Sequence, residues 1–345
     1  MVVLVLLGVA VALYVAATQR NDIVDAVDGP DDYAGTGHGS VRVTVERGQS
    51  AADVAATLLA NDVVKSAEAF TSAAAAEPGD VSIKPGVYVL SEQMSAESAL
   101  ALLLSDQTRV EVQFTVPEGL TTDEVVTTIA GQTDIEAADL QAVLDEPSSL
   151  GLPPYANGKA DGYLFPASYS IGPGTGAGQL LTTMVDRFEE TARRLDLVAG
   201  ARAQDLTAHD IVTVASLVQA ESSRPQDFGK AARVIYNRLD ASAPLQLDST
   251  VHFIAGTKGD VEISRRQRKL DSPYNTYRYA GLPPGPIVAP GSAALTAAIE
   301  PTPGQWLYFV TVNPETGETG FARTLDQHNL NLAKLRAFCR SSSSC

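Results

Sequence analysis

A weak internal repeat constrains the fold of this chain most, because two segments share one pattern of strand, turn and helix. The copies are VTVERGQSAADVAATL at residues 43–58 and FTVPEGLTTDEVVTTI at residues 114–129. In both, alternating apolar residues predict a strand and a glycine predicts the turn. A serine or threonine with an acidic residue three positions later then predicts a helix that starts with a capping box. We therefore expect an α+β fold.

The stretch between the two copies, residues 84–105, supplies another strand and then a helix with Leu100 and Leu103 on one face. Residues 41–108 are thus predicted to form a small β-α-α-β-α domain, which resembles a LysM carbohydrate-binding module. Because fold analogy alone does not establish a binding site, a spacer domain without a ligand is the alternative. The second copy falls in residues 109–159, which we interpret as a connector.

The N-terminal run from Val2 to Thr18, VVLVLLGVAVALYVAAT, carries no charge and reaches the lower length limit for crossing a bilayer. It predicts a transmembrane anchor over residues 1–19. A cleaved signal peptide is the alternative, although the basic n-region is missing. An acidic linker rich in Asp and Gly follows at residues 20–40 and suits the outer face under the positive-inside rule. We expect a single-pass protein of the cell (inner) membrane with its catalytic domain on the extracytoplasmic side.

Charge and composition exclude several classes of function. A formal net charge of -16 disfavours contact with phosphate backbones, so no nucleic-acid partner is expected. The four histidines are isolated in the sequence and form no metal-binding spacing, so no metal and no cofactor are expected. Cys339 and Cys345 either close a small disulfide in an exported domain or belong to a flexible tail over residues 338–345.

Residues 160–337 differ in kind, because aromatic, Pro, Asn and Gly residues gather there in long stretches between helices. Long ordered loops usually carry function, so we predict a mixed α+β catalytic domain. Within it, Thr207 and an aspartate three positions later predict a helix start. The inward stripe of that helix includes Val214 and Val218 and closes on Glu221, two turns after Val214.

Glu221 is the candidate catalytic residue, because it is predicted to lie at a buried helix C-terminus just before Pro225 bends the chain. Burial and the negative end of the helix dipole would both raise its pKa, which keeps the carboxyl protonated near neutral pH. A protonated glutamic acid can donate a proton to a glycosidic oxygen. The alternative is a structural ion pair with Arg224 or Arg238.

Five motifs carry a resemblance to a known family. VASLVQAES, YNRL, LQLDSTV, SPYNTYRYAGLPPGPIVAPG and WLYFV stand in the order and spacing of the YceG-like endolytic murein transglycosylases. The resemblance runs from about Val41 to His328. It implies that Glu221 is the catalytic acid, with Gln219 where the family often has a first glutamate. It also implies a membrane anchor, a LysM-like domain and cleavage of peptidoglycan glycan strands inside the chain, on nascent strands and beside wall-synthesis proteins.

The reaction that the resemblance implies needs one carboxyl group. Glu221 protonates the oxygen between MurNAc and GlcNAc and then deprotonates the muramyl C6 hydroxyl. That hydroxyl attacks C1 to give a 1,6-anhydroMurNAc end, and its intramolecular attack offsets the missing second carboxylate.

Five further residues are candidates for substrate binding. If LQLDSTV is extended, Gln246, Asp248 and Thr250 all face one side, although a hydrogen-bonded loop is the alternative. Asn275 and Tyr277 in SPYNTY are expected to bind N-acetyl and hydroxyl groups, with the tyrosine ring against a sugar face.

Two other functions stay open at this point. A muramidase-type hydrolase would use Asp248 as the partner of Glu221, because ordinary glycosidases need two carboxylates. A non-catalytic peptidoglycan-binding scaffold would need only the LysM-like domain.

Overall fold

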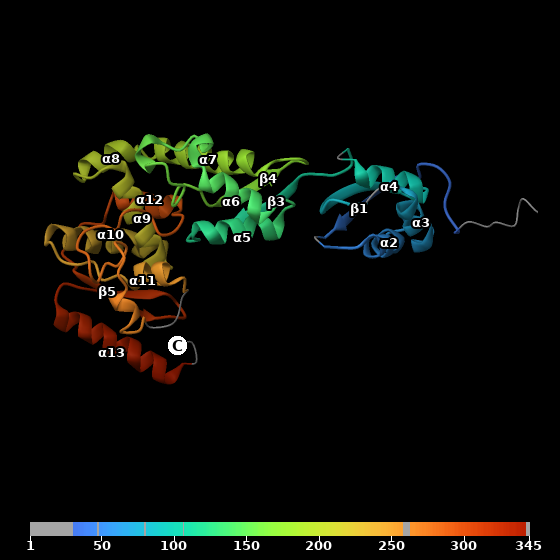
Figure 1. The fold of residues 1–345 in the computed structure, drawn as a ribbon. Helices are drawn as coiled ribbons and strands as arrows, with labels where there is room; N and C mark the ends of the chain where they lie inside the picture. Colours follow the sequence, from blue (N-terminus) through green and yellow to red (C-terminus); the bar gives the residue numbers. More distant parts are fainter. Residues whose placement is uncertain (1–29, 47, 79–80, 106, 258–262, 343–345) are drawn as a thin grey trace, which may run out of the picture. The chain divides into compact units, whose positions relative to one another are not determined.

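The computed structural model describes residues 30–46, 48–78, 81–105, 107–257 and 263–342. The predicted anchor at residues 1–19 therefore lies outside the described residues, as does Cys345. In the part of the chain that is described, none of the helices has the length and apolar character needed to cross a membrane. The fold is mixed α+β with small two-stranded sheets, as expected, and the chain divides into two compact units (Figure 1).

The first unit is Met1–Val112 together with Gly172–Gly174. Its elements are β1 (His38–Val45), α2 (Ala51–Ala60), α3 (Ala67–Ala76), β2 (Gly86–Glu92) and α4 (Ala96–Leu104), in the predicted order. β1 pairs with β2 in antiparallel fashion. The side chains that point inward from this pair, such as Val43 and Tyr88, pack against Leu58, Phe70 and Leu100 of the helices.

The second unit is Gln113–Ile171 together with Thr175–Cys345. Its elements in chain order are β3 (Val112–Val116), α5 (Thr122–Gln132), α6 (Ala137–Asp145), β4 (Ala167–Ile171), α7 (Ala177–Arg194), α8 (Leu197–Ala203), α9 (Ala208–Glu221), α10 (Pro225–Asp240), α11 (Asp248–Ala255), α12 (Ser292–Ile299), β5 (Tyr308–Asn313), β6 (Glu318–Ala322) and α13 (Leu325–Ser341). β3 pairs with β4, and β5 pairs with β6.

Both copies of the sequence repeat fold as predicted. The Ser50 and Thr121 side chains cap α2 and α5. In each helix an acidic side chain, Asp53 or Glu124, accepts from the backbone N–H of the capping residue, which completes a capping box. Gly48 and Gly119 adopt φ of +82° and +79°, which glycine reaches without steric cost. The second copy belongs to the second unit, where its turn lies beside α9 and the segment that leads into α12.

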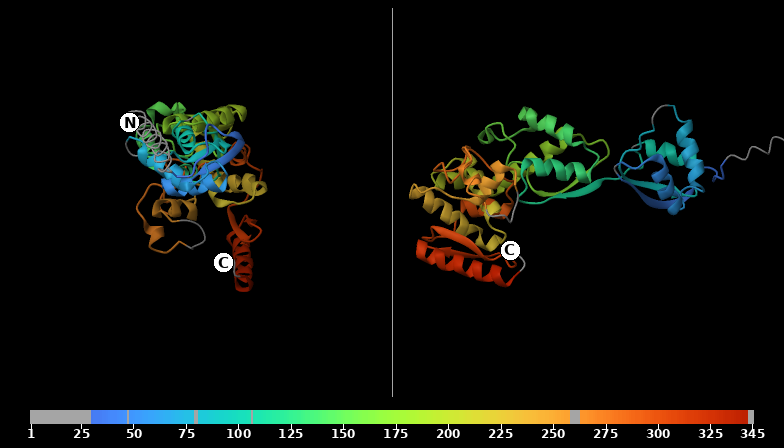
Figure 2. Two further views of the ribbon diagram at one scale, coloured as in Figure 1. Left: turned by 90° about the vertical axis from the view of Figure 1, so that its right-hand side faces the viewer. Right: turned by 60° about the horizontal axis from the view of Figure 1, so that its bottom comes forward.

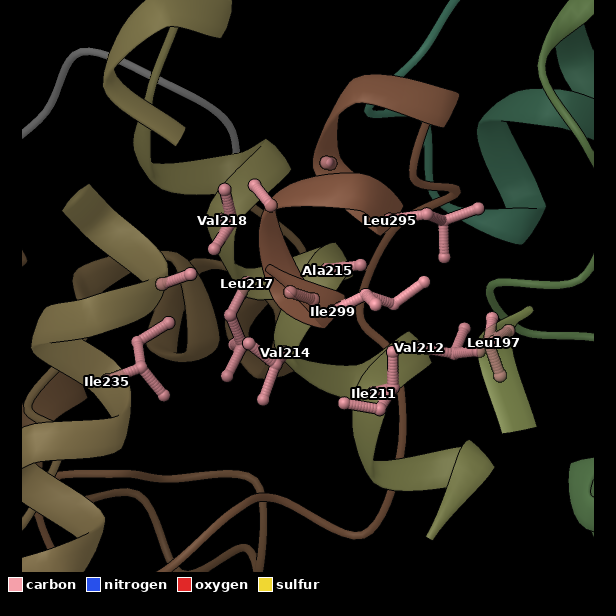
Figure 3. Close-up of a cluster of buried hydrophobic side chains, with 14 of the residues drawn as sticks. Leu197, Ile211, Val212, Val214, Ala215, Leu217, Val218, Ile235, Leu295 and Ile299 are labelled. Carbon is pink, nitrogen blue, oxygen red and sulfur yellow. The ribbon is translucent and has the colours of Figure 1, made fainter. Parts of the chain in front are cut away.

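Helix α9 lies at the centre of the second unit. Every residue from Ile211 to Val218 is buried, and α8, α10, α11 and α12 all contact the helix. Figure 3 shows its side chains between those of Leu197, Ile235 and Ile299, which come from the surrounding helices. A helix that is apolar on all faces must be enclosed, so the position of its C-terminal residue is fixed by the packing of the whole unit.

The hairpin of β5 and β6 forms a separate layer with α13 (Figures 1 and 2). The strands are antiparallel, with Phe309 opposite Phe321 and Val310 opposite Gly320. α13 lies against this hairpin and has no fully buried residue. Cys339, near the end of α13, is disulfide-bonded.

Close packing at Gly162 joins the 160–171 segment to the rest of the second unit. Gly162 has φ of +81°, and a Cβ there would lie 2.4 Å from the Pro286 ring. Gly162→Ala should therefore lower the free energy of unfolding by about 2–4 kcal/mol, because backbone strain and overpacking add. Gly151→Ala is the matched control, since Gly151 has φ of +68° but open space around it, and should cost about 1 kcal/mol. Equal losses in urea denaturation would contradict this account.

Candidate active site

Glu221 is the last residue of α9, and its carboxyl group lies against the first turn of α11. The Ser249 backbone N–H donates to Glu221 Oε1 at 3.4 Å. The Ser249 hydroxyl lies beside the same carboxyl but makes no hydrogen bond of normal geometry. Glu221 as a residue is partly exposed, whereas its carboxyl group is enclosed by protein.

Burial is the main reason that the pKa of Glu221 is raised above its ordinary value, because desolvation disfavours the carboxylate. The two groups of Ser249 act in the opposite direction, since they stabilise the anion. Asp248 raises the pKa further and the Arg238 guanidinium lowers it. The carboxyl group therefore stays protonated to a higher pH than that of a free glutamic acid. When it loses its proton, the Ser249 N–H stabilises the resulting carboxylate.

A cavity of about 850 Å³ opens in front of Glu221. Such a volume is within the range of ligand sites. The cavity is enclosed by several parts of the second unit, which are the ends of α9 and α10, the N-terminal part of α11, the hairpin of β5 and β6, and α13. Its polar and charged lining residues include Thr121, Glu124, Glu221, Arg238, Gln246, Asp248, Ser249, His252, Arg268, Tyr277 and His328.

Asp248 and Tyr277 lie together in this cavity. The Tyr277 hydroxyl donates a short hydrogen bond to Asp248 Oδ1, and the Arg268 guanidinium lies 5.2 Å from the tyrosine ring. Burial and the neighbouring carboxylate raise the pKa of Tyr277, so the phenol remains protonated. The Asp248 carboxylate is therefore occupied by a donor from its own chain.

The extended geometry expected for LQLDSTV is wrong. Asp248 begins helix α11, so Gln246, Asp248 and Thr250 do not alternate along one side. Thr250 is fully buried, where its hydroxyl donates to Leu247 O at 2.7 Å and pairs with Thr276 at 2.9 Å. Gln246 and Asp248 line the cavity, whereas Thr250 holds the entry to α11 and is not placed to bind a substrate.

Asn275 also has a different role from the one expected. Its side chain is fully buried, and its amide nitrogen donates to Arg268 O at 3.1 Å and to Leu270 O at 2.8 Å. Its side-chain oxygen accepts from the Tyr277 N–H at 3.1 Å. All of its hydrogen-bonding groups are used within the loop, so Asn275 positions Tyr277 instead of binding a sugar.

Arg238 enters the site from α10 and is held by main-chain oxygens. Its Nε donates to Leu307 O at 2.6 Å, and its Nη1 donates to Leu245 O at 2.6 Å. Among the described residues no salt bridge joins Glu221 to Arg238, and Arg224 pairs with Asp227 at 3.7 Å. The ion-pair interpretation of Glu221 is therefore wrong for both arginines, although Arg238 lines the cavity.

The turn of the second repeat copy contributes to the cavity, which sequence reasoning missed because it treated residues 109–159 as a connector. Gly119 donates its N–H to Ala289 O at 2.9 Å, and Ala289 donates to Leu120 O at 2.8 Å. Gln219, two residues before Glu221, accepts from the Gly291 N–H at 3.1 Å. The only sequence signal for this contact is the repeat itself, which predicts the turn but not its neighbours.

The described part of the chain contains no group of three or more His, Cys, Asp or Glu side chains placed to hold a metal ion. A protonated carboxylic acid at the edge of an open cavity, with a donor ready for its anion, can transfer a proton to a bound substrate and take one back.

Comparison with known proteins agrees with the motifs. The model of the YceG-like family matches residues 43–334. The endolytic murein transglycosylase of Bacillus subtilis (strain 168) is 30% identical over 308 residues, which cover 84% of this chain and 83% of that protein. The endolytic murein transglycosylase of Streptococcus pneumoniae serotype 2 is 30% identical over 326 residues, covering 85% of this chain and 58% of that protein.

The crystal structure of a putative YceG-like protein from Listeria monocytogenes is similar in fold, with a TM-score of 0.66 and 27% sequence identity. The alignment covers 84% of this chain and 98% of that one. Since the family model spans most of the sequence, this chain belongs to the YceG-like family.

Proposed function

We propose that this protein is an endolytic murein lytic transglycosylase, which cleaves the MurNAc-GlcNAc bond within peptidoglycan strands and leaves 1,6-anhydroMurNAc ends. The names of its relatives support this activity. The observation that carries the proposal is the enclosed carboxyl of Glu221 at the wall of a large cavity, with a raised pKa and no salt bridge to Arg224 or Arg238.

In the first step, Glu221 gives its proton to the glycosidic oxygen as the bond from that oxygen to muramyl C1 breaks. The anion that remains is stabilised by the Ser249 N–H and by the positive charge of Arg238. In the second step, the Glu221 carboxylate takes the proton of the muramyl C6 hydroxyl, and the C6 oxygen forms a bond to C1. The proton count of Glu221 returns to its starting value, so one residue serves as acid and then as base.

The need for a second carboxylate separates this reaction from hydrolysis. A muramidase needs a second carboxylate to activate water or to attack C1. Asp248 lines the same cavity, where Tyr277 donates to its Oδ1. A nucleophile from the substrate needs no second carboxylate, because an intramolecular hydroxyl has a high effective concentration.

The remaining parts of the proposal rest on the sequence. We propose that residues 1–19 anchor the protein in the cell membrane as a single pass, with the catalytic unit on the extracytoplasmic side. The first unit, with its β-α-α-β-α order, is proposed to act as a LysM-like domain that binds glycan strands. Nascent strands as substrate and wall-synthesis proteins as partners are proposed on the family resemblance.

Glu221→Gln should reduce the release of anhydromuramyl products by at least about 10³-fold, because the side chain can no longer donate or accept the proton. Mass spectrometry of peptidoglycan digests measures the products. Glu190→Gln on the exposed face of α7 is the matched control and should keep full activity. Retained turnover in Glu221→Gln, with both variants folded by circular dichroism, would overturn the assignment.

Asp248→Asn should slow the reaction by about 10-fold, because an amide oxygen accepts the Tyr277 hydrogen bond less strongly than a carboxylate does, yet the products should still carry anhydro ends. A hydrolase would instead lose nearly all activity in this variant and would give reducing ends in the wild type. The fraction of anhydro and reducing ends, measured by mass spectrometry in both proteins, decides between them.

The raised pKa of Glu221 also predicts how stability depends on pH. The folded state keeps this proton at pH values where the unfolded chain, with a pKa near 4.5, has lost it. Wild-type stability should therefore fall relative to Glu221→Gln as pH rises above about 4.5 towards the folded-state pKa, and the two proteins should respond alike below it. Urea denaturation of both proteins from pH 4 to 8 measures the difference. A constant difference across that range would contradict a raised pKa.

A further inference from the structure

His328 lies in the first turn of α13 and lines the same cavity as Glu221, yet no step of the reaction above uses it. Its ring stacks on Tyr308 of β5, with ring centroids 5.3 Å apart and an interplanar angle of 25°. The Arg238 guanidinium lies 5.2 Å from the same tyrosine ring. The imidazole therefore stacks on a tyrosine that Arg238 also contacts.

The two ring nitrogens of His328 have different surroundings. Nδ1 is buried and has no hydrogen-bond partner among the described residues. Nε2 is not among the buried atoms that lack a partner, and because His328 lines the cavity we assign the contact with a bound molecule to this nitrogen. Because a buried N–H without an acceptor is rarer than a buried acceptor without a donor, the proton belongs on Nε2.

His328 is also a neutral donor at neutral pH. Burial and the nearby Arg238 charge both lower the pKa of the ring below its ordinary value. The cavity therefore receives from α13 a single, uncharged N–H at Nε2. A neutral donor suits a carbonyl or hydroxyl oxygen and gives no ion pair with a carboxylate.

The side chains around His328 indicate which kind of oxygen accepts the hydrogen bond from its Nε2. Val310 of β5 and Leu332 and Leu335 of α13 line the cavity on this side. An aliphatic wall favours methyl groups and disfavours sugar hydroxyls, which would lose their hydrogen bonds to water there. A substituent that brings a carbonyl oxygen and a methyl group together matches both the donor and the wall.

We propose that His328 is a substrate-binding residue whose Nε2–H donates to the carbonyl oxygen of a substituent on the muramyl residue that also carries a methyl group. This inference rests on the proposed function, which supplies the muramyl substrate. Two substituents carry both groups, the N-acetyl group at C2 and the lactyl group, which is joined to C3 through an ether oxygen.

The test compares two replacements that place an amide nitrogen differently. Glutamine reaches the position of Nε2, whereas asparagine reaches only the position of Nδ1. His328→Asn should raise KM for peptidoglycan strands about 5- to 10-fold with kcat within about 2-fold of wild type, because one hydrogen bond to bound substrate is lost. His328→Gln should restore KM to within about 3-fold. Arg336→Gln, on the exposed part of α13, is the matched control and should not change either constant.

An unchanged KM in His328→Asn would overturn the proposal. So would equal defects in the Asn and Gln variants, because they would show that the ring only packs against Tyr308. Strands from which the N-acetyl groups have been removed identify the acceptor. If the acetyl carbonyl is the acceptor, His328→Asn and wild type have equal KM on those strands, and if the lactyl carbonyl is the acceptor, the difference persists.

Binding separates this proposal from the proposed function. Affinity for a peptide-bearing tetrasaccharide is measured by calorimetry with Glu221→Gln alone and combined with His328→Asn, so no turnover occurs. A 5- to 10-fold weaker affinity in the double variant supports the role of His328 even if the wild type releases no anhydro product. Equal affinities overturn that role even if the wild type is active.

Discussion

The enclosure of α9 is the constraint on which the rest of the second unit depends. A helix buried on every face from Ile211 to Val218 is stable only while its neighbouring helices surround it. Buried polar side chains on the helix are used to fix other segments, since Ser216 accepts the Ile287 N–H at 3.0 Å. The helix ends at Glu221, where the packing is open on one side. The buried core and the catalytic residue therefore lie on the same helix. The packing around α9 sets the position of the Glu221 carboxyl group.

The chemical state of Glu221 results from two opposing effects. Burial favours the protonated acid, and the first turn of α11 favours the anion, because Ser249 presents its N–H there. A group that must give a proton and then take one needs both forms to be accessible. Main-chain oxygens hold the Arg238 guanidinium in position by hydrogen bonds. Its positive charge lowers the pKa of Glu221 although the two side chains form no salt bridge.

Several segments that are distant in sequence complete the cavity, and the examples that follow are fixed by hydrogen bonds to the main chain. The turn at Gly119 pairs with Ala289, and the loop that ends in Tyr277 is ordered by Asn275. Backbone pairing of this kind places side chains without relying on flexible contacts. The hairpin and α13 add the aliphatic side chains of Val310, Leu332 and Leu335 to the lining of the cavity.

The sequence by itself determined what depends on neighbours within a few residues. Capping boxes at Ser50, Thr121 and Thr207, the turn glycines of the repeat and the apolar stripe that ends at Glu221 are all present, because each is set by local hydrogen bonds and by helical or strand periodicity. The five sequence motifs indicated the YceG-like family. The expectation for LQLDSTV was wrong because a short apolar alternation fits a strand and a helix equally well, and the start of the helix is hydrogen-bonded to Thr276, which is distant in sequence.

Tertiary structure alone decided which groups meet. The hydrogen bond from Tyr277 to Asp248, the burial of Thr250 and Asn275, the main-chain anchoring of Arg238 and the approach of His328 to the cavity join residues far apart in the chain. No local pattern encodes such contacts, since they arise when the whole unit packs around α9. The sequence therefore identified the acid, and the fold assigned the roles of the residues around it.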